Sequence, residues 1–145
     1  MTALLKEIIM YQHSFKVSTH GRGMINITNE VADIVLQAGV ITGICHLFLH
    51  HTSASLIVCE NADPDVQTDL DMFMNRFILD GDPEFKHLAE GPDDMSAHIR
   101  TVLTSTALSI PVTKMHLNLG TWQGIFVWEH RKNPHERKIT VTIQG

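Results

Sequence analysis

The chain has 145 residues, the usual size of one compact domain, and 43% of them are hydrophobic while 19% are charged. These proportions exclude a disordered chain, and the longest apolar stretches fall far short of a membrane-spanning helix. The formal net charge of −5 argues against a general nucleic-acid binder, whose phosphate contacts need a basic surface. We therefore expect a single domain over residues 1–145 that binds neither nucleic acid nor membranes.

The N-terminal stretch and the two cysteines indicate the cellular compartment of the protein. Residues 1–12 contain Lys6 and Glu7 where a signal peptide needs an apolar core. Cys45 and Cys59 lie in apolar runs without the CxxC spacing of a metal or redox site, so we expect reduced, packed thiols. Both observations predict a cytoplasmic protein.

Hydrophobic periodicity and turn residues predict the elements of the first half of the chain. Strands are expected over residues 7–17, 41–51 and 56–59, with a flexible turn over 20–23. A helix is expected from Thr28 or Asn29, either of which can cap it, to Gly39, which ends it. Its apolar residues share one face, and they are Val31, Ile34, Val35 and Ala38.

The second half begins with a strong helix signal. In the run from Asp63 to Asp65, the aspartate caps, Pro64 fits the first helical position, and the acids favour the positive end of the helix dipole. The predicted core stripe of this helix comprises Val66, Leu70, Phe73, Met74 and Phe77.

An acidic loop runs to Asp94, and a further amphipathic helix follows with Met95, Ile99, Val102 and Leu103 as its apolar residues. Strands are then predicted over 108–112, 115–119, 121–129 and 138–143. The resulting order, β-α-β-β-α-α-β-β-β, is typical of an α+β domain with three helices and a largely antiparallel sheet.

Ten histidines suggest where chemistry takes place. His51 ends an apolar row of its strand, and a polar group in that position needs a hydrogen bond or a metal. His98 lies at the border of the apolar stripe of its helix, and His87 lies in the acidic loop eleven residues earlier. The loop can fold His87 onto His98, so we consider all three as metal ligands, with capping or surface histidines as the alternative.

The strand over 121–129 contains a second candidate group. Alternation places Gln123 and Glu129 at the two ends of one apolar row, and it places Trp122 on the other face, which we expect to be core. A buried amide or carboxylate needs partners, so both structural pairing and a role in a site remain open for Glu129.

Several runs of the sequence together resemble the YjbQ family. These runs are His51-Thr-Ser-Ala-Ser-Leu56, Glu60-Asn-Ala-Asp-Pro64, Asp93-Asp-Met-Ser-Ala-His98, Leu119-Gly-Thr-Trp-Gln123 and Glu129-His-Arg131. The resemblance extends from Tyr11 to Gly145 and implies a small α+β protein that forms homotrimers. Some members are labelled secondary thiamine-phosphate synthases. The family pattern falls here on His51, Thr52, Ser53, Glu60, Asp63, His87, His98, Trp122, Gln123 and Glu129.

Three functions follow from these observations. The resemblance implies a transferase that joins hydroxymethylpyrimidine pyrophosphate to thiazole phosphate, a reaction that needs cations such as Mg²⁺ on the leaving group. The histidines favour a Zn-type hydrolase or lyase with His51, His87 and His98 as ligands. The third reading is a trimeric module that binds a small anion without catalysis.

We assign provisional roles to the candidate residues. Glu129 is the candidate base, and His51 and Gln123 complete the catalytic group. The ligand, a small phosphorylated or anionic molecule, is expected to contact Thr52, Ser53, Glu60, Asp63, Trp122 and Arg137.

Overall fold

In a computed structural model, residues 7–145 form an α+β domain with antiparallel sheets, as predicted; Met1 to Lys6, the start of the N-terminal stretch discussed above, lie outside the described residues. The strands are β1 (Met10–Ser18), β2 (Gly23–Asn26), β3 (Thr42–Leu49), β4 (Ala54–Glu60), β5 (Ala107–Thr113), β6 (His116–Leu117), β7 (Gln123–Glu129) and β8 (Glu136–Gln144). The helices are α1 (Thr28–Ala38), α2 (Pro64–Phe77) and α3 (Asp94–Leu103).

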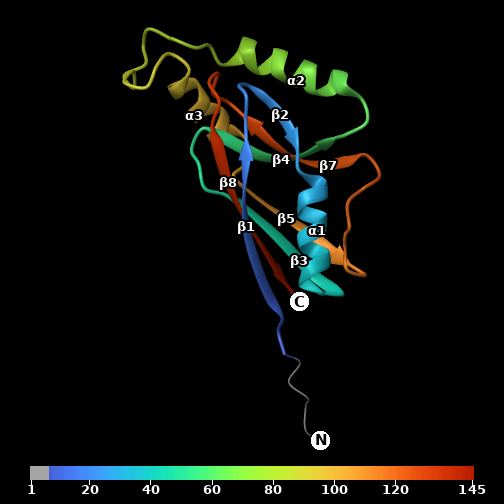
Figure 1. The fold of residues 1–145 in the computed structure, drawn as a ribbon. Helices are drawn as coiled ribbons and strands as arrows, with labels where there is room; N and C mark the ends of the chain where they lie inside the picture. Colours follow the sequence, from blue (N-terminus) through green and yellow to red (C-terminus); the bar gives the residue numbers. More distant parts are fainter. Residues whose placement is uncertain (1–6) are drawn as a thin grey trace, which may run out of the picture.

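The strands form two antiparallel sheets where one was expected. The larger has the order β1-β8-β3-β5-β6, and the smaller has the order β2-β7-β4. β2 was not anticipated, because the glycines at 21 and 23 suggested a turn only, yet the strand pairs along β7 from Gly23 opposite Glu129 to Asn26 opposite Phe126. Figure 1 shows the long β1 and β8 strands running down the molecule, with α2 across one end.

The core lies between the two sheets and α1. In β3 the residues Cys45, Leu47 and Leu49 are all buried, as the alternation predicted, whereas Ile41 precedes the strand and is exposed. Helix α1 contributes Val31, Ile34 and Val35 to the same cluster. Burial of these side chains is the main stabilising contribution to the fold.

The ends of α1 show one confirmed expectation and one correction. Gly39 ends the helix in the left-handed conformation, with φ of 67°. Ile27 precedes the helix without a side-chain cap, and the expected cap Thr28 instead accepts a hydrogen bond from the backbone N–H of Ile125 at 2.9 Å. The hydroxyl therefore ties the helix start to β7.

Helix α2 begins as predicted, but most of its apolar stripe is not core. The Asp63 carboxylate accepts a hydrogen bond from the backbone N–H of Asp65 at 2.9 Å, which caps the helix. Met74 is buried, whereas Phe73 and Phe77 are exposed and stack on each other with ring centroids 5.7 Å apart. Met74 clusters with Trp128 of the small sheet, whereas the two phenylalanines contact each other and remain open to solvent.

Helix α3 has the opposite polarity from that expected. Its inward face is small and polar and comprises Asp94, Ser96, Ala97, Arg100 and Thr101. Part of its predicted apolar stripe faces outward, with Val102 83% exposed and Leu103 57% exposed, whereas Ile99 packs against the cluster of Met74, Ile78 and Trp128. The inward face packs against β4, where the Thr101 hydroxyl donates to the Ala54 carbonyl, and its charged residues meet the neighbouring loops, where Arg131 pairs with Asp94.

Trp122 also departs from prediction. It precedes β7 in a turn and is 63% exposed, because the strand begins at Gln123 and the indole is not part of either sheet face. Trp128, predicted to share its face, is buried and donates its indole N–H to Asp71 at 2.9 Å. Across residues 7–145, no helix is long and apolar enough to cross a membrane.

The two tryptophans make a matched test of this packing. We expect Trp128→Ala to lower the free energy of unfolding by about 3 to 5 kcal/mol, as for other buried aromatic truncations. Trp122→Ala should cost less than about 1 kcal/mol, because the side chain buries little surface in this chain. Urea denaturation of both variants checks this, and equal losses would show that the indole of Trp122 is packed.

Candidate functional site

A fully buried carboxylate, Glu129 at the end of β7, organises one end of the molecule. Its Oε1 accepts hydrogen bonds from the backbone N–H groups of His130 and Arg131, each at 3.0 Å. Its Oε2 accepts from the Thr19 hydroxyl at 2.7 Å. The guanidinium of Arg137 spans both oxygens, with Nε to Oε2 at 2.7 Å and Nη2 to Oε1 at 2.5 Å.

This pairing gives Glu129 a structural role. Burial alone would raise the pKa of Glu129, but hydrogen bonds from Arg137, the Arg131 backbone and Thr19 outweigh it and hold the pKa below its usual value. A carboxylate with every lone pair engaged is a poor general base. Arg137 is occupied in turn, since its Nη2 also donates to the hydroxyl of Ser53 at 3.0 Å. Of the two options left open by the sequence, the geometry favours structural pairing for Glu129.

His51 lies next to this network and is held in one tautomer. Its Nε2 accepts a hydrogen bond from the backbone N–H of Lys138 at 2.8 Å. A backbone N–H can only donate, so the proton of the neutral ring is on Nδ1. Burial lowers the pKa of His51, and the nearby charge of Arg137 lowers it further. His51 is therefore a neutral ring that offers an N–H donor.

A cavity of about 490 Å³ opens beside His51. The loop between β3 and β4 contributes His50, His51 and Thr52 to its wall, and α3 contributes His98 from the other side. The remaining lining residues are Phe48, Leu49, Thr101, Val102 and Thr106. The cavity thus combines three apolar side chains with three histidines and three threonines, and convergent polar groups in an apolar cavity are typical of a small-molecule site.

At the edge of this cavity, three side chains meet in a group with metal-ligand chemistry. His87 Nε2 lies 2.6 Å from Oδ2 of Asp94, and His98 Nε2 lies 3.1 Å from the same oxygen. The ligating atoms of all three residues lie within 4.8 Å of one another. The acidic loop does fold His87 onto His98, with ring centroids 5.4 Å apart.

The composition of this group differs from the one expected. Asp94 takes the third position, and His51 is not among the residues that converge, although it lines the same cavity as His98. The sequence contained a usable signal, because Asp94 and His98 are four residues apart on one helix and so lie on the same face.

The hydrogen bonds of His98 place its Nε2, an acceptor in the neutral ring, opposite a carboxylate oxygen of Asp94, which is also an acceptor. Its Nδ1 lies 2.9 Å from the backbone carbonyl of Thr52, which can only accept, so Nδ1 carries a hydrogen. In the neutral ring Nε2 then has a bare lone pair, and it points at a carboxylate oxygen of Asp94. A positive charge, either a proton or a metal ion, is required between the two atoms.

Arg131 supports Asp94 from the other oxygen. Its Nη1 contacts Oδ1 of Asp94 at 2.6 Å, and its Nε contacts Asp93 at 3.1 Å, which leaves Oδ2 for the histidines. Burial alone would raise the pKa of Asp94, but its contacts with His87 and Glu90 and the charges of His98 and Arg131 lower it overall. The carboxylate is therefore ionised and oriented before any ligand arrives.

The other predicted residues lie elsewhere. Gln123 is exposed, and its amide oxygen accepts a hydrogen bond from the backbone N–H of Gly120 at 2.8 Å. Glu60 is opposite Gln123 in the β4–β7 ladder and accepts from the backbone N–H of Asp63 at 2.9 Å, while Ala54 is opposite Glu129. Gln123 and Glu129 are six residues apart along β7, which corresponds to roughly 20 Å. A group of four predicted residues at the other end of this ladder therefore lies far from His51, Thr52 and His98; it comprises Gln123, Glu60, Asp63 and Trp122.

Comparison with known proteins identifies the family. The model of the family described as "UPF0047 protein YjbQ-like" matches residues 13–145, so the chain belongs to this family. A UPF0047 protein of Synechocystis is 45% identical over 135 residues, covering 93% of this chain and 92% of the relative. The UPF0047 protein YjbQ of Escherichia coli O157:H7 is 40% identical over 136 residues, covering 93% of this chain and 98% of the relative.

A solved structure agrees with the fold. A YbjQ-like protein of unknown function from Sulfolobus solfataricus superposes with a TM-score of 0.87 at 28% identity, covering 96% of this chain and 99% of that one. These relatives define a family and a fold, and their names state no activity.

The structural role of the Glu129–Arg137 pair can be tested by breaking it. Arg137→Met leaves a buried carboxylate without its counter-charge and should cost about 3 to 5 kcal/mol in free energy of unfolding. The double variant Glu129→Gln with Arg137→Met should recover much of that loss, because no unpaired charge remains. Urea denaturation measures both, and a double variant as unstable as the sum of the single variants would contradict the pairing.

Proposed function

We propose that this protein binds a divalent metal ion of the Zn²⁺ type through His87, Asp94 and His98, and acts as a hydrolase or lyase on a small molecule in the adjacent cavity. The observation that carries the proposal is the contact between His98 Nε2 and the Asp94 carboxylate at 3.1 Å, with the other ring nitrogen already committed to a carbonyl. A metal-ligating histidine usually donates its second N–H in this way, which fixes the ring.

The donor set fits such an ion. Two imidazole nitrogens and one carboxylate oxygen are a common catalytic zinc set, which leaves a fourth position for water. When bound, the ion would supply a Lewis acid and a water of lowered pKa. Of this chain's own groups, Arg131 would orient Asp94, the Thr52 carbonyl would orient His98, and His51 would offer a hydrogen bond to the substrate.

The other two functions have less support. Transfer to or from a pyrophosphate needs cations, and none of the described residues that line the cavity of His51 and His98 is a lysine or arginine. Thiamine-phosphate synthesis would therefore depend on Mg²⁺ alone there, and turnover of the two thiamine precursors tests it directly. A non-catalytic anion-binding module predicts that the protein binds no metal at these histidines.

Metal content of the His-ligand variants provides the main test. We expect protein purified without a histidine tag to hold close to one ion per chain, and His87→Ala and His98→Ala each to weaken binding at least tenfold. His51→Ala should retain the ion, because its Nε2 is bonded to the Lys138 backbone instead. Elemental analysis and equilibrium dialysis measure this, with the exposed His13→Ala as control.

The same measurement has a pH dependence with a definite sign. Imidazole ligands must lose their protons to bind, so metal affinity should fall as the pH drops through about 6.5. A parent protein that binds no ion at pH 8, or alanine variants that keep it, would sink the metal proposal.

We also propose that the chain assembles as a homotrimer. Val102 of α3 and Phe48 both line the wall of the cavity, and both are exposed in the single chain, as is Leu103 next to Val102. A second copy of the chain would cover this surface. A substrate cavity of this kind would then lie next to a neighbouring subunit.

Light scattering on the purified protein checks this. The expected mass is three times the 16.3 kDa of the chain, and Val102→Asp should reduce it because a buried charge disfavours the contact. Met72→Asp, at an exposed position of α2, serves as a control that should leave the mass unchanged. A 16.3 kDa particle at micromolar concentration would end the idea.

A further inference from the structure

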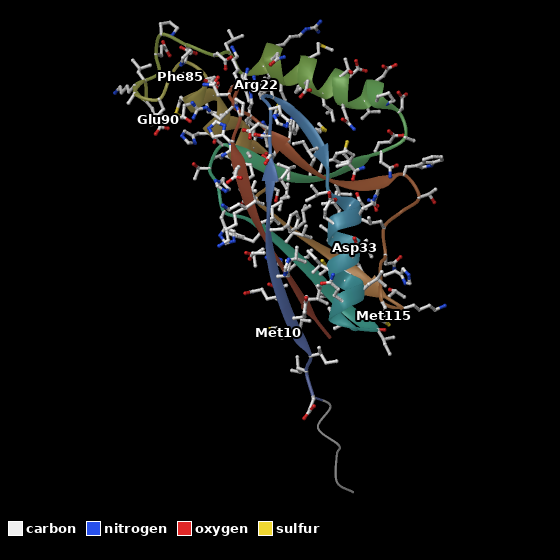
Figure 2. The ribbon with its side chains drawn as sticks, in the orientation of Figure 1. Met10, Arg22, Asp33, Phe85, Glu90 and Met115 are labelled. Atoms are coloured by element: carbon white, nitrogen blue, oxygen red, sulfur yellow. The ribbon has the colours of Figure 1, made fainter. Side chains whose placement is uncertain are left out.

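A second cavity, of about 510 Å³, lies behind α3 and is lined by three basic side chains. Arg22 comes from the turn between β1 and β2, Arg100 from α3, and Lys132 from the loop between β7 and β8. Asp80 is the one carboxylate among the described lining residues. Figure 2 places Arg22 at the end of the molecule that also holds Glu90 of the acidic loop.

The single carboxylate is shared by two of the three cations. Arg22 forms a bidentate pair with Asp80, in which Nη1 donates to Oδ2 at 2.9 Å and Nη2 donates to Oδ1 at 2.6 Å. Lys132 Nζ contacts Oδ2 at 2.9 Å, and the Ser96 hydroxyl donates to Oδ1. Four donors on two oxygens leave Asp80 no capacity for a further cation.

Arg100 is the third cation, and no salt bridge within residues 7–145 includes it. Its side chain is buried, with the residue 3% exposed, and no carboxylate forms an ion pair with it among the described residues. Its Nη2 donates to Asn75 Oδ1 at 3.2 Å and to the Ile78 carbonyl at 3.1 Å. Its Nε is buried without a hydrogen-bond partner. A buried guanidinium in this state is costly unless an anion completes its surroundings.

We propose that this cavity is a binding site for a phosphate group, either as inorganic phosphate or carried by a small phosphomonoester. Three cations against one carboxylate leave two positive charges, which match the charge of a phosphate near neutral pH. The planar fork of arginine suits phosphate oxygens, and a lysine ammonium adds a point charge at the rim.

The phosphate site is separate from the histidine cavity. Side chains two positions apart in an α-helix point in directions about 200° apart around the helix axis, so His98 and Arg100 lie on opposite sides of α3. The two cavities share none of their lining residues. They are nevertheless joined, because the backbone N–H of Lys132 donates to Asp93 at 2.9 Å and the neighbouring Arg131 holds both Asp93 and Asp94.

The basic cavity also differs from the phosphate-binding position that the sequence predicted. Arg137 was the residue expected to meet a phosphorylated ligand, but it is 3% exposed and committed to Glu129. The three cations that replace it, Arg22, Arg100 and Lys132, come from three segments distant in the sequence, so no local motif indicates them.

Titration calorimetry with inorganic phosphate, on chelator-treated protein in a chloride buffer, tests the proposal. The parent should bind phosphate, and Lys132→Met should bind about tenfold more weakly, as for loss of one charge-assisted contact. Lys16→Met is the matched control, because Lys16 is likewise an exposed lysine paired with one carboxylate, Glu136 at 3.3 Å. This control should bind as the parent does.

Two further variants separate the possible outcomes. Arg100→Met should lose phosphate binding if circular dichroism shows it folded, and Lys132→Met decides the matter if it is not. His98→Ala should keep phosphate binding, since the sites are distinct. No phosphate binding by the parent, equal binding by Lys132→Met, or loss of binding in His98→Ala would each overturn the proposal.

A final arm distinguishes the two sources of the phosphate group. If glycerol phosphate binds with the same affinity as inorganic phosphate, the site is assigned to the free ion. An ester that binds at least tenfold more tightly would assign it to a phosphomonoester.

Discussion

The buried carboxylate of Glu129 is the interaction on which this end of the molecule depends. It receives donors from the β1–β2 turn through Thr19, from the loop after β7 through two backbone N–H groups, and from β8 through Arg137. Arg137 extends the network to Ser53 in the β3–β4 loop. One charge therefore sets the relative positions of the segments that carry His51, Thr52 and Arg131. Desolvation of the two charges offsets much of their attraction, so the net contribution of the pair to stability is small, whereas loss of one partner is costly.

Helix α3 is the second organising element, and its polarity explains the placement of both cavities. Its inward face presents Asp94 toward Arg131 and Arg100 toward the basic cavity, while its outward face is apolar. Such a helix cannot be stabilised by core packing alone, so its position depends on ion pairs with neighbouring loops. The polar chemistry of the protein is thereby concentrated around one short helix.

Local sequence patterns correctly predicted the elements whose side chains pack in the hydrophobic core. Alternation in β3 and the stripe of α1 correctly gave buried faces, because there the side chains meet only other apolar groups. The α+β class and the family followed from the same sequence. Helices α2 and α3 were predicted as elements, but only part of each predicted apolar stripe is packed, namely Leu70 and Met74 in α2 and Ile99 in α3, since periodicity cannot tell a core face from a face left for another surface. The prediction for Trp122 failed for a different reason, because the strand starts two residues later than predicted, at Gln123.

The candidate site was predictable only in part. His87 and His98 were expected to lie together and do so, whereas Asp94 was missed as their partner. His51, expected to join them because it ends an apolar strand row, lines the cavity but is not part of the group. The tautomer of each ring depends on a backbone group from a distant strand or loop, namely Lys138 for His51 and Thr52 for His98. Sequence spacing contains no information about such contacts.

The three candidate ligands differ in how firmly the fold holds them. Asp94 and His98 sit on a packed helix and are fixed by Arg131 and by the Thr52 carbonyl. His87 sits in the loop that Gly81 and Pro92 close with a backbone hydrogen bond of 2.9 Å, and its neighbours in that loop are mostly exposed. Two ligands are thus preorganised and the third is attached to a segment of low local stability. The entropy of ordering that loop is a cost of completing the site, so the length and composition of the acidic loop tune how tightly the site closes.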